Sequence, residues 1–118
     1  VPSVRYTALQ ALAQLPAEAL AAHAPTIVGK LEDSMSGVRE AAVEALAKLP
    51  AEALAAHAAA IVGKLGDSDE NVRKAAVKTL ATLSTEALKP HASGIVGKLE
   101  QLSGQESQEA VRLLAAKG

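Results

Sequence analysis

The sequence predicts an all-α fold in which two-helix units stack into an α-solenoid with a period of 34 residues. Three observations lead to this prediction. The chain of 118 residues repeats itself at a fixed offset, and the apolar residues of each copy follow helical spacing. Alanine is the commonest of the hydrophobic residues that make up 49% of the chain, and Tyr6 is the only aromatic residue. Small side chains suit thin layers of closely packed helices better than one thick core, which usually contains several large aromatics.

The repetition becomes visible when the sequence is compared with itself at an offset of 34 residues. The segments that recur are PAEALAAHA, at 16–24 and 50–58, and IVGKL, at 27–31, 61–65 and 95–99. These matches divide one domain, 1–118, into a half repeat at 1–15, repeats at 16–49 and 50–83, and a diverged repeat at 84–117. A helix pair that buries only one face of each helix must stack on its neighbours to bury the rest, so the array predicts a solenoid.

Each full repeat begins with an interrupted helical segment. In the first full copy we expect a short helix at 16–22, helix A at 25–32 and a turn at 33–36. Pro25 falls at the interruption, and Pro90 occupies nearly the same position in the last copy. Because proline inside a helix removes a hydrogen bond and clashes with the preceding turn, these two residues predict a break before helix A.

The second half of each repeat predicts helix B, which runs to Leu49 in the first full copy. Its apolar residues fall on one stripe of a helix: Val38, Ala42, Leu46 and Leu49. Ser36, or Ser34 if the helix begins earlier, is the expected N-cap because a hydroxyl there accepts a hydrogen bond from the first turn.

The sequence around the turn resembles the HEAT repeat. Residues 30–46 read KLEDSMSGVREAAVEAL and residues 64–80 read KLGDSDENVRKAAVKTL. In that family a leucine ends helix A, an aspartate follows in the turn, and Val-Arg opens helix B. The resemblance implies a right-handed superhelix whose concave face, lined by helix B, is the usual partner-binding side. It also implies a structural ladder between neighbouring units, made by Arg5, Asp33, Arg39, Asp67 and Arg73.

Composition and charge argue against several other functions. The formal net charge of −1 and the single aromatic residue give no basic groove with stacking rings, so we expect no nucleic-acid binding. No apolar run approaches the roughly 18 residues of a membrane span, and no signal peptide is visible. The chain also contains no cysteine. We therefore expect a cytoplasmic protein that does not bind membranes.

Three histidines recur once per repeat and invite a metal hypothesis: His23, His57 and His91. Equivalent positions on stacked helices lie about 8–10 Å apart, which is too far for two imidazoles to share one zinc ion. Each histidine is followed by alanine, whereas the HEAT-like metal hydroxylases use His-Glu pairs. We therefore interpret the histidines as connector residues and expect neither a metal site nor catalysis.

A Gly-Lys pair also recurs in each repeat, at 29–30, 63–64 and 97–98. These pairs lack the frame of a phosphate-binding loop and are followed by leucine within a helix. We interpret the glycines as allowing close approach of neighbouring helices, and we expect no cofactor.

Helix-B residues off the apolar stripe vary between copies, while the core positions stay constant. This pattern is typical of a constant scaffold with a variable binding surface. We predict a non-enzymatic scaffold that binds a protein or peptide on its helix-B face. The candidate contact residues are Tyr6, Gln10, Glu40, Glu44, Lys48, Lys74, Lys78 and Arg112.

Two alternatives stay open. The near-identical blocks and the missing initiator methionine also fit a purely structural or designed segment of a longer array with no partner of its own. In the half repeat, Val4 and Leu12 lack a helix A of their own. A second copy of the chain is therefore a further candidate partner, through this uncapped N-terminal end.

Overall fold

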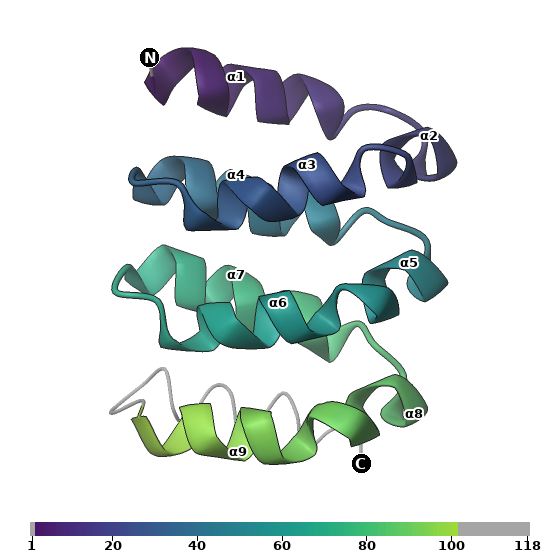
Figure 1. Cartoon of the computed structure of the whole chain (residues 1–118), viewed down its shortest axis with the longest axis vertical. Coiled ribbons are helices and arrows are strands. Elements are labelled where there is room, and N and C mark those ends of the chain that lie inside the picture. Colours follow the sequence, from purple (N-terminus) through teal and green to yellow (C-terminus); the bar gives the residue numbers. More distant parts are fainter. Residues whose placement is uncertain (1, 102–118) are drawn as a thin grey trace. The chain divides into compact units, whose positions relative to one another are not determined.

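The computed structural model describes residues 2–101, and every regular element in that range is a helix. None of the helices described is both long enough and apolar enough to cross a bilayer. By its contacts the chain divides into two compact units, residues 1–57 and 58–118. Figure 1 shows the elements of each unit in sequence colours.

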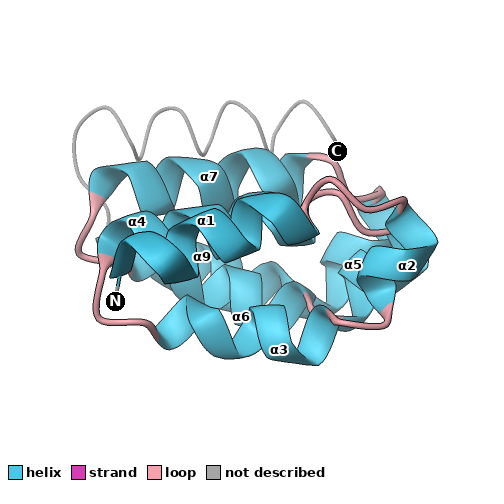
Figure 2. Ribbon diagram, turned by 90° about the horizontal axis from the view of Figure 1, so that it is seen from above, coloured by secondary structure: helices cyan, strands magenta, loops and turns pink. Residues whose placement is uncertain are grey.

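Unit 1, residues 1–57, contains two B helices and one complete helix A. Its elements are α1 (Pro2–Leu12), α2 (Ala17–Ala21), α3 (Ala24–Gly29), the 3₁₀ helix η1 (Lys30–Glu32), α4 (Ser36–Leu46) and α5 (Ala51–Ala56). Helix A consists of α3 and η1, and both pack against α4, which also packs against α1. The unit therefore has two layers, with α1 and α4 in one and α3 in the other (Figure 2).

Unit 2, residues 58–118, contains one B helix and two A helices in its described part. Its elements are α6 (Ala58–Gly63), η2 (Lys64–Gly66), α7 (Glu70–Ala81), α8 (Thr85–Leu88), η3 (Lys89–His91) and α9 (Ala92–Gln101). Here α6 and η2 form helix A and pack against α7, while α9 packs against α6 and η2. Elements α2, α3, η1 and α4 begin 34 residues before α5, α6, η2 and α7, respectively.

The core of each unit comes from the stripes on helices A and B. In α4 and the turn after it the buried stripe is Val38, Ala42, Leu46 and Leu49. In α7 and the turn after it the equivalent residues Val72, Ala76, Leu80 and Leu83 are also buried. Helix A contributes Ile27 and Leu31 in unit 1 and Ile61 and Leu65 in unit 2. The apolar spacing of the sequence thus gives the faces on which the helices pack.

In the first two full copies the break before helix A lies at the histidine. His23 precedes α3 with φ −107° and ψ 8°, and His57 follows α5 with nearly the same angles, φ −108° and ψ 11°. Pro25 lies in the first turn of α3, where its missing N–H leaves no helical hydrogen bond unmade. Ala59 takes the position of Pro25 in the second copy, yet the helix still breaks there. The break is therefore a property of both copies, with or without proline.

The prediction that Ser36 or Ser34 is the N-cap of helix B is wrong. Met35, rather than Ser36 or Ser34, is the N-cap of α4, and its side chain accepts no hydrogen bond. In α7 the equivalent position is Asp69, whose carboxylate accepts hydrogen bonds from the backbone N–H groups of Asn71 and Val72, at 2.9 and 3.2 Å. The two copies of helix B thus differ in capping because methionine replaces an acceptor side chain.

We expect Met35→Asp to raise the free energy of unfolding by about 1 kcal/mol, because it supplies the carboxylate cap that α7 already has. Urea unfolding followed by circular dichroism measures the change. Asp69→Ala is the matched control and should lower the free energy of unfolding by a similar amount. Equal stability of Met35→Asp and the wild type would contradict this account of the α4 cap.

The expectation that the repeated glycines allow close helix approach is also wrong. A Cβ atom placed on Gly29, Gly63 or Gly97 meets no other group within 4 Å. Gly29 and Gly63 have helical backbone angles, with φ near −59° and −58°. These glycines therefore face open space, and no packing contact within residues 2–101 explains them.

Candidate functional site

A groove of about 310 Å³ runs between α1 and α4, the two B helices of unit 1. Its rim carries four exposed polar side chains from the two helices and the turns that follow them: Gln10, Gln14, Glu44 and Lys48. Its floor is formed by Leu9, Ala13, Ala41 and Ala45. Three of the candidate contact residues named from the sequence, Gln10, Glu44 and Lys48, are thus brought together around one groove.

The groove exists because its floor is made mostly of alanine. Packed helices lie about 8–10 Å apart, and alanine side chains are too short to fill the space along the outer seam of such a pair. Ala45 is fully buried and Ala41 is 6% exposed, so these two residues also hold α4 in the core. The result is a narrow apolar floor between amide and charged side chains.

Tyr6 extends the polar rim along α1. Its hydroxyl accepts a hydrogen bond from Nε2 of Gln10, one turn away, at 2.9 Å. This bond uses the amide N–H₂ of Gln10 and directs the ring of Tyr6, which is 40% exposed. The Gln10 carbonyl oxygen keeps its acceptor capacity for a group outside the chain.

The other candidate contact residues lie elsewhere. Glu40 is half-buried on α4. On α7, Lys74 pairs with Glu70 at 2.9 Å, and Lys78 is exposed in the last turn. Arg112 lies outside the described residues.

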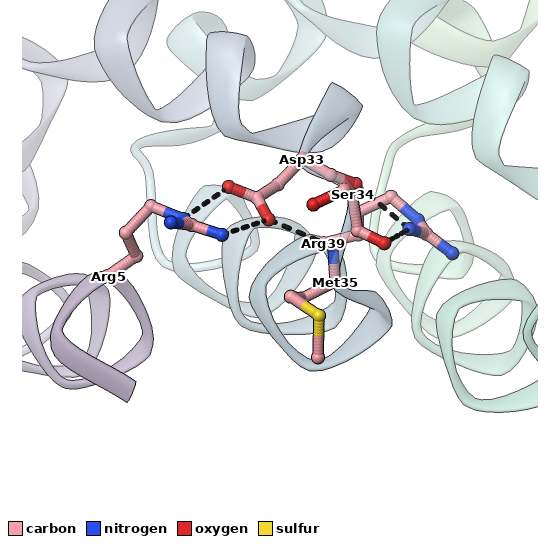
Figure 3. Close-up of polar contacts among 5 residues, drawn as sticks. All are labelled: Arg5, Asp33, Ser34, Met35 and Arg39. Carbon is pink, nitrogen blue, oxygen red and sulfur yellow. Dashed lines mark hydrogen bonds and ion pairs between the residues drawn. The ribbon is translucent and has the colours of Figure 1, made fainter. Parts of the chain in front are cut away.

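A second polar cluster forms at the turn between helix A and helix B (Figure 3). The guanidinium of Arg5 donates to both carboxylate oxygens of Asp33, from Nε at 2.7 Å and from Nη2 at 3.1 Å. The same carboxylate accepts the backbone N–H of Met35 at 2.9 Å. The Asp33 side chain is only 8% exposed. This pair joins α1 to the turn that precedes α4.

Arg39 and Arg73 bind the turns of their own repeats. Nη1 of Arg39 donates to the carbonyl oxygens of Asp33 and Ser34, at 2.9 and 3.2 Å. Nη1 of Arg73 donates to the carbonyl oxygen of Asp67 at 2.8 Å. The carboxylate of Asp67 accepts the N–H of Asp69 at 2.9 Å, as Asp33 does for Met35. Each helix-B arginine therefore ties down the end of its helix A.

Two family models match these segments of the chain. Residues 36–83, from the start of α4 through α7 and the turn that follows it, match the model described as HEAT-like repeat. Residues 25–46 match the model of the HEAT repeat associated with sister chromatid cohesion. The chain belongs to the HEAT-repeat family. Searches of curated proteins and of solved structures gave no match.

HEAT repeats generally mediate protein–protein interaction, and proteins built from them are typically non-enzymatic scaffolds. In this HEAT-repeat chain His23 and His57 lie at the junctions between short helix and helix A, and His91 ends η3. Within residues 2–101 no three His, Asp or Glu side chains gather in an arrangement that could hold a metal ion.

The HEAT turn of unit 1 predicts a pH dependence of stability. The hydrogen bond from Arg5, together with that from the Met35 N–H, lowers the pKa of Asp33 below the ordinary aspartate value of about 3.9. The stabilisation is therefore complete above pH ~4 and is lost as the pH falls through the lower pKa of the folded protein.

We expect Asp33→Asn to be less stable than the wild type at neutral pH, and we expect this difference to shrink as the pH falls below about 4. Urea unfolding of both proteins at a series of pH values measures it. A difference that stays constant into acid would show that ionised Asp33 does not stabilise the turn.

Proposed function

We propose that this chain is a protein-interaction scaffold that binds a protein or peptide segment in the α1–α4 groove of its helix-B face. The observation that carries the proposal is the groove itself, with an apolar floor beneath a rim of Gln10, Gln14, Glu44 and Lys48. Amide side chains can bond to the N–H and C=O groups of an extended peptide, while an alanine floor accepts its apolar side chains.

The charges on the rim support a peptide as the occupant. Glu44 and Lys48 lie one turn apart on α4, and neither takes part in an ion pair within the described residues. Both side chains are exposed, so their charges are free to meet opposite charges on a partner. Charge pairs formed across an interface determine the register and the choice of partner more than they add affinity.

We also propose that the whole of 1–118 forms one right-handed solenoid domain with a 34-residue period. The equal spacing of corresponding elements in the two units supports this. In this solenoid the ladder residues have a structural role: Arg5, Asp33, Arg39, Asp67 and Arg73. The binding face then extends beyond the groove to the other variable helix-B residues: Tyr6, Glu40, Lys74, Lys78 and Arg112.

The test uses peptides selected from a displayed random library against the intact chain, with affinities measured by titration. Ala13→Leu fills the floor, and the double variant Glu44→Lys, Lys48→Glu exchanges the rim charges without changing the net charge. We expect each to weaken binding at least about tenfold, a loss of roughly 1.4 kcal/mol. Ala59→Leu, at an exposed position of α6, is the matched control and should leave the affinity unchanged.

Thermal unfolding of each variant establishes that its fold is retained. Equal affinities of the wild type and Ala13→Leu would place any binding outside the groove. Failure to select any peptide would favour the alternative, a repeat segment that is purely structural.

A further inference from the structure

The two walls of the α1–α4 groove differ in charge. Gln10 and Glu44 lie at equivalent positions of α1 and α4, and Gln14 and Lys48 lie at equivalent positions of the turns that follow. In each of these turns the backbone N–H of the rim residue bonds to the carbonyl oxygen three residues earlier, at 3.1 Å. The α1 wall therefore presents two neutral amides, while the α4 wall presents a negative charge followed by a positive charge.

These two charges do not neutralise each other. In α7, Glu70 and Lys74 have the same spacing and order, and they form an ion pair at 2.9 Å. Glu44 and Lys48 form no ion pair within the described residues. The reason is that α4 ends at Leu46, so Lys48 lies in a tighter turn where a spacing of four residues no longer stacks two side chains. Two opposite charges are thus held apart along one wall.

The floor of the groove favours an extended segment over a helix. Three of its four residues, Leu9, Ala41 and Ala45, are at most 6% exposed, so the apolar strip is narrow. An amphipathic helix is about 10–12 Å across and docks with an apolar face at least about 100° wide. A strip this narrow, in a groove of about 310 Å³, does not match such a face. An extended segment instead presents single side chains to the floor.

The spacing of the two charges also matches an extended segment. Four residues of a helix rise by about 6 Å along its axis, and two residues of an extended chain span about 6.4–6.8 Å. In an extended chain side chains i and i+2 point to one side, and side chain i+1 points to the other. When side chain i+1 enters the floor, side chains i and i+2 therefore lie at the level of Glu44 and Lys48.

We propose that the groove selects extended segments in which a basic and an acidic residue flank one small apolar residue. This selectivity rests on the proposed function, because it names the class of peptide that the groove takes. The basic side chain pairs with Glu44, the acidic side chain pairs with Lys48, and the apolar side chain between them contacts Ala13 and Ala41. Either chain direction satisfies this pattern, since reversal only exchanges the order of the two charges.

The probes are four fluorescent peptides, GSGKVEGSG, GSGEVKGSG, GSGKVKGSG and GSGEVEGSG, titrated with the intact chain at low ionic strength. We expect the better of the two opposite-charge peptides to bind at least about fivefold more tightly than either like-charge peptide. Each like-charge peptide replaces one attraction with a repulsion, and an exposed pair of charges contributes up to about 1 kcal/mol. Added salt should reduce this preference, because it screens exposed charges.

Single charge reversals at the rim should change which peptide binds best. Glu44→Lys makes both rim charges positive and should prefer GSGEVEGSG, whereas Lys48→Glu makes both negative and should prefer GSGKVKGSG. Glu18→Lys is the matched control, since this exposed carboxylate on α2 does not line the groove, and it should keep the wild-type preference. Each preference is a ratio within one variant, so a partial loss of folded protein does not change it.

The Ala13→Leu variant separates this proposal from the proposed function. Equal binding of the four peptides that Ala13→Leu abolishes would overturn the charge selectivity and leave the groove as a peptide site. Binding that Ala13→Leu leaves unchanged would overturn both. The selectivity would also be overturned if none of the four peptides bound, or if Glu44→Lys and Lys48→Glu kept the wild-type preference.

Discussion

Leu46→Ala is expected to lower the free energy of unfolding by about 2–5 kcal/mol, the largest effect of any single substitution considered. Leu46 is fully buried on α4, which packs against α1, α3 and η1. Its truncation removes apolar contact and leaves a cavity that helices fixed on several sides cannot close. The change is measured by urea unfolding, with the helix signal followed by circular dichroism. Leu80→Ala in α7, also fully buried, should cost a similar amount.

Leu15→Ala is the matched control for this prediction. It makes the same chemical change at a position that is 37% exposed, so the loss should stay below about 1 kcal/mol. A melting temperature of Leu46→Ala equal to that of the wild type would contradict the placement of Leu46 in the core. A loss as large for Leu15→Ala as for Leu46→Ala would mean that Leu15 is buried in solution.

The helices could be placed from the sequence because two periodicities agree. The 34-residue offset locates equivalent positions, and the 3.6-residue spacing of Val38, Ala42 and Leu46 locates the buried face. The end of helix B was less well predicted. α4 ends at Leu46, and Lys48 and Leu49 follow in a tighter turn whose N–H groups bond to the carbonyls three residues earlier. Apolar spacing cannot distinguish a continued α-helix from this tighter turn, because Leu49 is buried in either case.

The cause of the break before helix A could not be read from proline. Pro25 marks the correct place, but the break at His57 occurs where the sequence has alanine. A run of alanine and leucine has high helix propensity, so local propensity alone gives no reason for a break within 51–63. The break recurs at the same position of both copies, and the propensity of one segment does not account for it.

The groove was only half predictable for a related reason. Variation between copies pointed to Gln10, Glu44 and Lys48, because exposed positions are free to differ. It gave no reason to select Ala41 or Ala45, since alanine at a repeated position looks like ordinary core. Whether an alanine leaves a groove depends on the distance between two packed helices, and that distance is set by the tertiary structure.

The glycines show how a correct repeat can lead to a wrong physical interpretation. Their recurrence in three copies favoured a packing role, in which a side chain would clash with a neighbouring helix. In the structure, however, Gly29 and Gly63 have open space where a Cβ would lie and backbone angles that alanine adopts readily. Each glycine therefore costs helix stability without a compensating contact in the described residues.

The double variant Gly29→Ala, Gly63→Ala is accordingly expected to raise the free energy of unfolding by about 1–2 kcal/mol, roughly 0.5–1 kcal/mol from each site. The gain arises because alanine restricts the unfolded chain more than glycine does and fits the folded backbone without strain. Urea unfolding measures the double variant and both single variants, whose effects should add because a Cβ at either site meets no other group within 4 Å. Ala59→Gly, at an exposed position of α6, is the reverse control and should lose about 1 kcal/mol. A loss of stability in Gly29→Ala would show that a neighbouring group occupies the space beside helix A, and would restore the packing role that the repeat first suggested.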